Sequence, residues 1–190
     1  GLASSGRTSL RLSWENGTPT VSGPGARYLK NLGATVTTVG RLTLLETGGD
    51  GDWAFGGRAM SLRILDGTHV LVWCVTPEWD AYFGEADLIS HLALLPRSAA
   101  VLCVVTMADL QPSNADLAAR AQHYARSFSA LCNSHPLLCY RHTGCCVVSA
   151  TDSSVFHPLT WIHSALDTFH LDWDDSHDGV INFFQQNENV

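Results

Sequence analysis

The chain has 190 residues, of which 45% are hydrophobic, and this suits one globular domain of ordinary size. Its formal net charge of −7 argues against a nucleic-acid groove or an anionic membrane surface as the main partner. Nucleotide binding stays open, because it needs only local positive charge. No run of about 18 apolar residues occurs, so we expect no membrane-spanning helix and no direct membrane insertion.

The first nine residues, GLASSGRTS, follow the phosphate-binding loop pattern G-x-x-x-x-G-K-[ST], with Arg7 in place of the lysine. Glycine permits a tight turn that aims backbone N–H groups at phosphate oxygens, and the Thr8 hydroxyl suits Mg²⁺. Because arginine is a flat fork and lysine a compact point charge, we expect weakened phosphate binding. The candidate phosphate contacts are Gly1, Ser4, Ser5, Gly6, Arg7, Thr8 and Ser9.

The predicted elements begin with a short helix behind this loop, Thr8–Trp14, followed by a Gly/Pro-rich loop over residues 15–31. Two short β-type runs around a glycine predict a hairpin, Thr35–Val39 and Arg41–Leu45. A second Gly-rich loop is predicted over residues 48–57.

Three near-continuous apolar runs come next, as is typical of strands buried on both faces: His69–Thr76, Ala99–Thr106 and Gly144–Ala150. Amphipathic helical patterns alternate with them, over Glu85–Leu95, Asn114–Cys132 and Val155–Phe169. This alternation predicts an α/β fold with a mostly parallel central sheet and helices on both faces. Ligands of such sheets bind at the carboxyl ends of the strands.

Polar motifs stand at these strand ends. Glu46 begins the run Glu46-Thr47-Gly48-Gly49-Asp50, where a carboxylate is expected in the Mg²⁺ shell and the Gly49 N–H is expected to reach a γ-phosphate. The Thr35 hydroxyl, between the two motifs, is a further candidate for Mg²⁺ and the γ-phosphate. The candidate metal ligands are therefore Thr8, Thr35 and Glu46.

Two further strand ends carry candidate base-recognition residues. Thr106-Met107-Ala108-Asp109 follows a buried strand, and the Asp109 carboxylate can accept from N1–H and the exocyclic N2 of guanine. Ser149-Ala150 follows the last strand, where a backbone N–H would meet the base carbonyl.

This order of motifs resembles the GTPase domain of the Rag/Gtr family, on the Rag A/B (Gtr1-type) side. The resemblance covers nearly the whole chain and lies in Gly6-Arg7-Thr8-Ser9, "LGAT" at Leu32–Thr35, Thr47-Gly48-Gly49, and Ser149–Leu166. It implies a P-loop NTPase fold of the small-GTPase type over residues 1–169, with its first strand upstream of residue 1. Residues 170–190 would then lead towards a roadblock-type domain.

The resemblance also implies a GTP/GDP switch that uses Mg²⁺ in amino-acid signalling to the target-of-rapamycin kinase complex. The implied partner is a C/D-type Rag paralogue, as a heterodimer, together with scaffold proteins. The implied location is the cytoplasm, with recruitment to the lysosome or vacuole surface.

Several residues depart from the family pattern. Arg7 replaces lysine, Glu46 replaces aspartate, and Asp50 stands where a water-orienting glutamine is expected. With Asp50 and Thr35 as the candidate catalytic residues, hydrolysis should be slow, because a carboxylate beside the γ-phosphate repels it. Thr106 and Met107 replace a polar residue and a lysine beside the base. The alternative is a pseudo-GTPase, an interaction module that keeps the fold without efficient nucleotide binding or hydrolysis.

Overall fold

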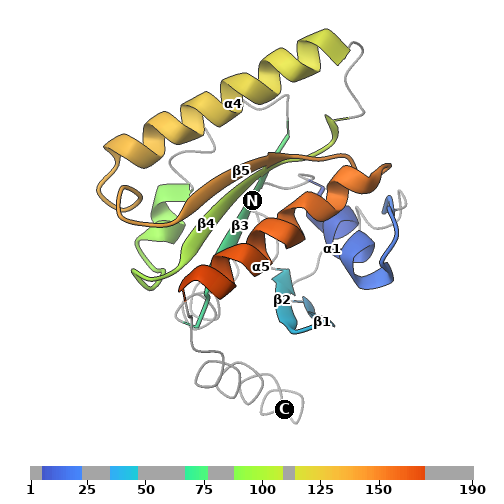
Figure 1. Ribbon diagram of the computed structural model, residues 1–190, viewed down its shortest axis with the longest axis horizontal. Helices are drawn as coiled ribbons and strands as arrows, with labels where there is room; N and C mark the ends of the chain where they lie inside the picture. The colour runs from blue at the N-terminus through green and yellow to red at the C-terminus, as the bar shows by residue number, and fades with distance from the viewer. Residues whose placement is uncertain (1–5, 23–34, 47–66, 77–87, 109–113, 170–190) are drawn as a thin grey trace, which may run out of the picture.

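The structure, a computed structural model, describes residues 6–22, 35–46, 67–76, 88–108 and 114–169, and it has a mixed α/β architecture (Figure 1). Its elements follow in chain order: α1 (Arg7–Asn16), β1 (Thr35–Val39), β2 (Leu42–Glu46), β3 (Val70–Val75), β4 (Ala100–Val105), α4 (Asn114–Ser134), β5 (Thr143–Val147), the 3₁₀ turn η4 (Ser153–Phe156) and α5 (His157–Phe169). The predicted alternation of strands and helices is confirmed for these residues. No helix among them is long and apolar enough to cross a membrane.

The strands β3, β4 and β5 form a parallel sheet in that spatial order. Their ends are in register, with Val75 beside Val105 and Val105 beside Val147. All six residues of the central strand β4 are buried, which confirms the prediction of a strand covered on both faces. Parallel strands need crossover connections, and α4 lies in the connection from β4 to β5.

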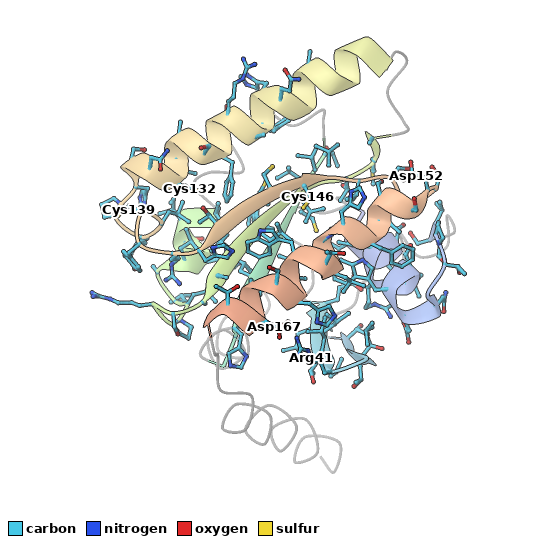
Figure 2. The ribbon with its side chains drawn as sticks, in the orientation of Figure 1. Arg41, Cys132, Cys139, Cys146, Asp152 and Asp167 are labelled. Carbon is cyan, nitrogen blue, oxygen red and sulfur yellow. The ribbon has the colours of Figure 1, made fainter. Side chains whose placement is uncertain are left out.

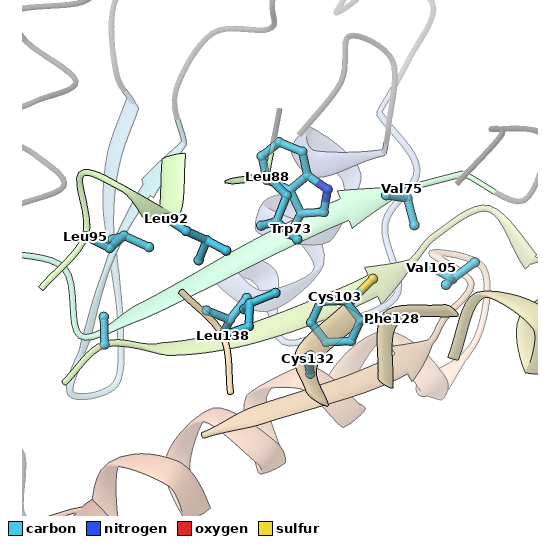
Figure 3. Packing of buried hydrophobic residues seen from close by; sticks show 12 residues of the cluster. Trp73, Val75, Leu88, Leu92, Leu95, Cys103, Val105, Phe128, Cys132 and Leu138 are labelled. Atoms are coloured by element: carbon cyan, nitrogen blue, oxygen red, sulfur yellow. The ribbon is translucent and has the colours of Figure 1, made fainter. Parts of the chain in front are cut away.

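Helices cover both faces of this sheet. Figure 1 shows α4 on one side of the three strands and α5, with α1, on the other. The core under α4 includes Trp73, Leu92, Cys103, Phe128 and Leu138 (Figure 3). The opposite core takes Leu10 and Trp14 from α1, Leu42 from β2, Leu102 and Val104 from β4, and Ile162 and Leu166 from α5. Alternate residues of β4 therefore serve opposite cores, as the strand period of two requires.

The predicted hairpin is an antiparallel two-stranded sheet of β1 and β2. Gly40 makes its turn at φ 59°, a left-handed backbone conformation that glycine adopts without steric cost. Its register places Thr35 opposite Glu46. At the turn, the Arg41 guanidinium pairs with the Asp167 carboxylate of α5, and both residues are labelled in Figure 2.

α1 and α4 are longer than predicted, β3, β4 and β5 are shorter, β1 has the predicted bounds and β2 is shifted by one residue. α1 continues to Asn16, two residues past the predicted end, and Gly17 closes it at φ 68°. The last predicted helix begins instead with the 3₁₀ turn η4, where the Asp152 side chain accepts from the Ser154 N–H. The loop predicted over residues 48–57, the first residues of the helix predicted from Glu85 and the segment 170–190 lie outside the described residues.

One buried cation supports the connection between β3 and β4. Arg141 is 8% exposed and precedes β5. Its guanidinium donates to the carbonyl oxygens of Leu92 and Leu95 at 3.3 and 3.2 Å and of Ala99 at 3.0 Å, and also to that of Pro96. It thereby adds donors to carbonyl groups where this helical segment ends, of which those of Leu92 and Pro96 also accept from the Leu95 and Ala99 N–H groups.

Candidate functional site

The start of α1 is built on Gly6. This residue adopts φ 71° and ψ 7°, and its carbonyl accepts the first helical hydrogen bond from the Leu10 N–H at 3.0 Å. A left-handed residue before the first turn exposes the N-terminal N–H groups, which carry the positive end of the helix dipole. Gly6 offers these N–H groups no side-chain cap, and phosphate binding by this half of the loop stays a prediction. Gly1, Ser4 and Ser5 lie outside the described residues.

Gly6 also contacts the end of β4. A Cβ on Gly6 would lie 3.2 Å from Cβ and Oγ1 of Thr106 and 3.5 Å from Cε of Met107. Thr106 is 3% exposed, and both its backbone N–H and its hydroxyl donate to the Val75 carbonyl, at 2.8 and 3.1 Å. The predicted phosphate and base segments thus meet at the carboxyl ends of β3 and β4. The Thr106 side chain holds these strand ends together.

Thr8 and Glu46, which are 38 residues apart, meet through a hydrogen bond. The Thr8 hydroxyl donates to Glu46 Oε1 at 2.6 Å. α1 supplies the hydroxyl from its first turn and β2 supplies the carboxylate from its last residue. The sequence predicted both as ligands of one cation, and the structure brings them together.

Thr35 reaches the same place from β1. It is the direct cross-strand partner of Glu46, so the two side chains share one face of the hairpin, with Cβ atoms about 4.5–5.5 Å apart. The three residues predicted as metal ligands, Thr8, Thr35 and Glu46, therefore come from three elements that meet at Glu46. Asp50, the other candidate catalytic residue, lies outside the described residues.

Arg11 belongs to this site, although its sequence context did not single it out. Its Nε donates to Glu46 Oε2 at 2.8 Å, and its NH1 group donates to Glu15 Oε2 at 2.6 Å. The side chains of Arg11 and Glu46 are only 16% and 10% exposed. The available signal was helical spacing, because Thr8, Arg11 and Glu15 recur at intervals of three and four along one face of α1.

Ser9 and Arg7 occupy other faces of the first turn. Ser9 is buried, and its hydroxyl lies 2.9 Å from that of Ser22 and accepts from the Ser22 N–H at 3.0 Å. Ser9 thereby anchors the chain that follows α1. Burial raises the pKa of the Cys74 thiol on β3 to about 11, and the charge of Arg7 acts in the opposite direction, to lower it.

Ser149 and Ala150 follow β5 beside the β4 loop, which is tied to them by a hydrogen bond from the Ala108 N–H to the Val148 carbonyl at 3.3 Å. The Ser149 N–H already donates to Ser154 Oγ at 2.9 Å. Of the predicted pair, Ser149 therefore has its N–H engaged within the protein, and the role of Ala150 stays a prediction. Asp109 and Gly49 lie outside the described residues.

Compared with known proteins, the sequence matches no family model and no curated protein. Among the residues that the structure describes, no group of three or more His, Cys, Asp or Glu side chains is placed to hold a metal ion. The described residues of the predicted site lie at the start of α1, in β1 and at the ends of β2, β4 and β5.

Proposed function

We propose that this chain is a guanine-nucleotide-binding switch of the P-loop, small-GTPase type, resembling the Rag family, and that it hydrolyses GTP slowly. The observation that carries the proposal is the 2.6 Å hydrogen bond between Thr8 and Glu46. It joins the hydroxyl of the phosphate-loop motif to the carboxylate of the second motif. Two motifs chosen from sequence as parts of one site thus lie in contact, beside a helix N-terminus suited to phosphate.

Each part of the nucleotide has a proposed partner. The N–H groups at the start of α1 and the Arg7 guanidinium would receive the phosphates. The Asp109 carboxylate would accept from N1–H and N2 of guanine, and the Ala150 N–H would donate to its carbonyl. We expect hydrolysis to be slow because the Asp50 carboxylate would repel the γ-phosphate. It stands where a glutamine amide would orient the attacking water.

The cellular part of the proposal is supported by the resemblance. We propose pairing with a C/D-type Rag paralogue, contact with scaffold and target-of-rapamycin complex proteins, and recruitment to the lysosome or vacuole surface.

The second candidate is a pseudo-GTPase that serves as an interaction module. The observation that favours it is the ion pair between Arg11 and Glu46, with its 2.8 Å contact, because a carboxylate held by a guanidinium is a poor partner for a divalent cation. Without that cation the developing charge of hydrolysis loses a main source of stabilisation.

Single-turnover hydrolysis of radiolabelled GTP by the wild-type chain and by Asp50→Gln distinguishes the two candidates. The switch predicts slow turnover that rises by about tenfold or more in the variant, because the amide can orient water. Asp167→Asn, which changes an exposed carboxylate paired with Arg41 on α5, is the matched control and should leave the rate unchanged. Binding without hydrolysis in both chains would favour the pseudo-GTPase.

A further inference from the structure

Glu46 has both carboxylate oxygens engaged by the protein itself. Oε1 accepts from the Thr8 hydroxyl at 2.6 Å, and Oε2 accepts from Arg11 Nε at 2.8 Å. The side chains of Arg11 and Glu46 are largely shielded from water, so screening of the pair is weaker than at an exposed site. Arg11 is therefore the nearest counter-ion of this carboxylate, and a protein donor occupies each of its two oxygens.

Arg11 is also held through a second nitrogen of its guanidinium. Its NH1 group donates to Glu15 Oε2 at 2.6 Å, and Glu15 Oε1 accepts from the Thr37 hydroxyl of β1 at 3.1 Å. The guanidinium thus bridges a carboxylate of β2 and a carboxylate of its own helix, one turn on. Because the guanidinium is planar and its donors are fixed relative to one another, Arg11 loses little side-chain entropy for each hydrogen bond that it makes to the two carboxylates.

This arrangement does not fit a tightly held Mg²⁺. Magnesium in proteins is bound through one or two carboxylates in near-ideal octahedral geometry, with waters and substrate phosphates completing the shell. Among the described residues, Glu46 is the one carboxylate in contact with the Thr8 hydroxyl, and it already carries a guanidinium. A dication beside Thr8 would be repelled by the like charge of Arg11, which already occupies Glu46 Oε2, and the cluster of Arg11 with Glu46 and Glu15 leaves only one net negative charge to offset that repulsion.

We propose that Arg11 is the resident cation of this site: it takes the place of a divalent cation at Glu46, so that nucleotide binding does not require Mg²⁺. The proposal rests on the nucleotide-binding function proposed above. Arg11 acts through Glu46 and Thr8, and is therefore a positioning residue for the phosphate loop.

Titration of the nucleotide-free chain with Mn²⁺, followed by electron paramagnetic resonance, tests the cation site directly, since Mn²⁺ shares the preference of Mg²⁺ for oxygen ligands. The wild-type chain should show no saturable site. Arg11→Met should gain one site per chain, and Arg11→Met/Glu46→Gln should lose it again. Arg41→Met removes a guanidinium from an exposed pair with Asp167 and is the matched control, which should behave as wild type.

GDP affinity, measured with excess Mg²⁺ and with excess EDTA, gives the second readout. The wild-type Kd should change by less than about threefold, whereas Arg11→Met should bind about tenfold or more tightly with Mg²⁺ than without it. Saturable Mn²⁺ binding by the wild type that Glu46→Gln abolishes would overturn the proposal, even if Arg11→Met does not fold. Absence of GDP binding under both conditions would instead refute the proposed function, while the Mn²⁺ titration would still decide the role of Arg11.

Discussion

Gly6 lies against Thr106 so closely that a Cβ on the glycine would stand 3.2 Å from the threonine Cβ. This contact joins the first residue before α1 to the first residue after β4. Because Thr106 is itself bonded to the Val75 carbonyl, the beginning of the helix is fixed relative to two parallel strands. The contact of α1 with the carboxyl edge of the sheet therefore depends on a position without a side chain.

The first prediction concerns this glycine. Gly6→Ala should lower the free energy of unfolding by more than the cost of about 1–2 kcal/mol for a left-handed alanine, because its methyl group also crowds Thr106. Gly17→Ala is the matched control, since Gly17 has nearly the same φ, 68°, but no atom lies within 4 Å of the place its new methyl group would take. Urea denaturation measures both. Equal losses of unfolding free energy in the two variants would show that the contact with Thr106 does not affect stability.

The second prediction concerns the buried guanidinium of Arg141. Arg141→Lys keeps the charge but supplies three donors on a flexible stem, so the Leu95 and Ala99 carbonyls lose a guanidinium donor. We expect a loss of about 2–3 kcal/mol, since each unsatisfied buried acceptor costs about 1–3 kcal/mol and water replaces some of the donors. Chemical denaturation gives the value. Arg97→Lys, at an exposed position, should change stability little, and a similar loss there would contradict the assignment.

The third prediction concerns Gly144 on β5, which lies under the Trp161 indole of α5. A Cβ at Gly144 would come within 2.9 Å of Trp161 Cζ2, and the indole is stacked on His142 at a centroid distance of 4.9 Å. Gly144→Ala should therefore destabilise the fold by about 1–3 kcal/mol through overpacking.

A double-mutant cycle with Trp161→Phe provides the control, because the smaller ring makes room for the new methyl group. The double variant should be more stable than the sum of the single effects predicts, by at least about 0.5 kcal/mol. Strict additivity would mean that the two side chains do not meet.

The fourth prediction concerns thiol reactivity. Burial raises the pKa of Cys74 to about 11, above the value of about 8.5 for a free thiol, so the folded protein holds the unreactive protonated form at pH 8 and at pH 9.5. Cys139 is exposed. Iodoacetamide should modify Cys139 in the folded chain at both pH values and spare Cys74 until denaturant is added, as followed by peptide mass spectrometry. Modification of Cys74 at the rate of Cys139 in the folded chain would contradict the described packing.

The sequence predicted those parts of the fold that depend on local pattern. The apolar run around Ala100–Val105 could be identified as a doubly covered strand, and the β-type run at Thr35–Val39 has the predicted bounds. The helix ends were less exact, because Gly17 permits two further residues in α1 and a 3₁₀ turn capped by Asp152 precedes α5. Ends depend on particular capping contacts, which apolar periodicity does not record.

For the candidate site, the sequence predicted one pair of residues that the structure places in contact, but not the hydrogen bonds or the further partner of that pair. The order of the motifs predicted that Thr8 and Glu46 belong to one site, and the structure places them in contact. Arg11 was missed because an arginine on a helix face has many possible partners, and only the tertiary fold brings Glu46 to it. In the same way, no local sequence pattern indicates that Ser154 Oγ accepts a hydrogen bond from the Ser149 N–H.

The central claim, that this chain binds guanine nucleotide at the phosphate loop, is tested most directly by isothermal titration with GDP, GTP and ATP, on the wild type and on Asp109→Ala. We predict binding of GDP and GTP and much weaker binding of ATP, with the preference for guanine lost in the variant because the bidentate acceptor is gone. No heat with any nucleotide, or equal affinity for ATP and GTP that Asp109→Ala leaves unchanged, would contradict the account.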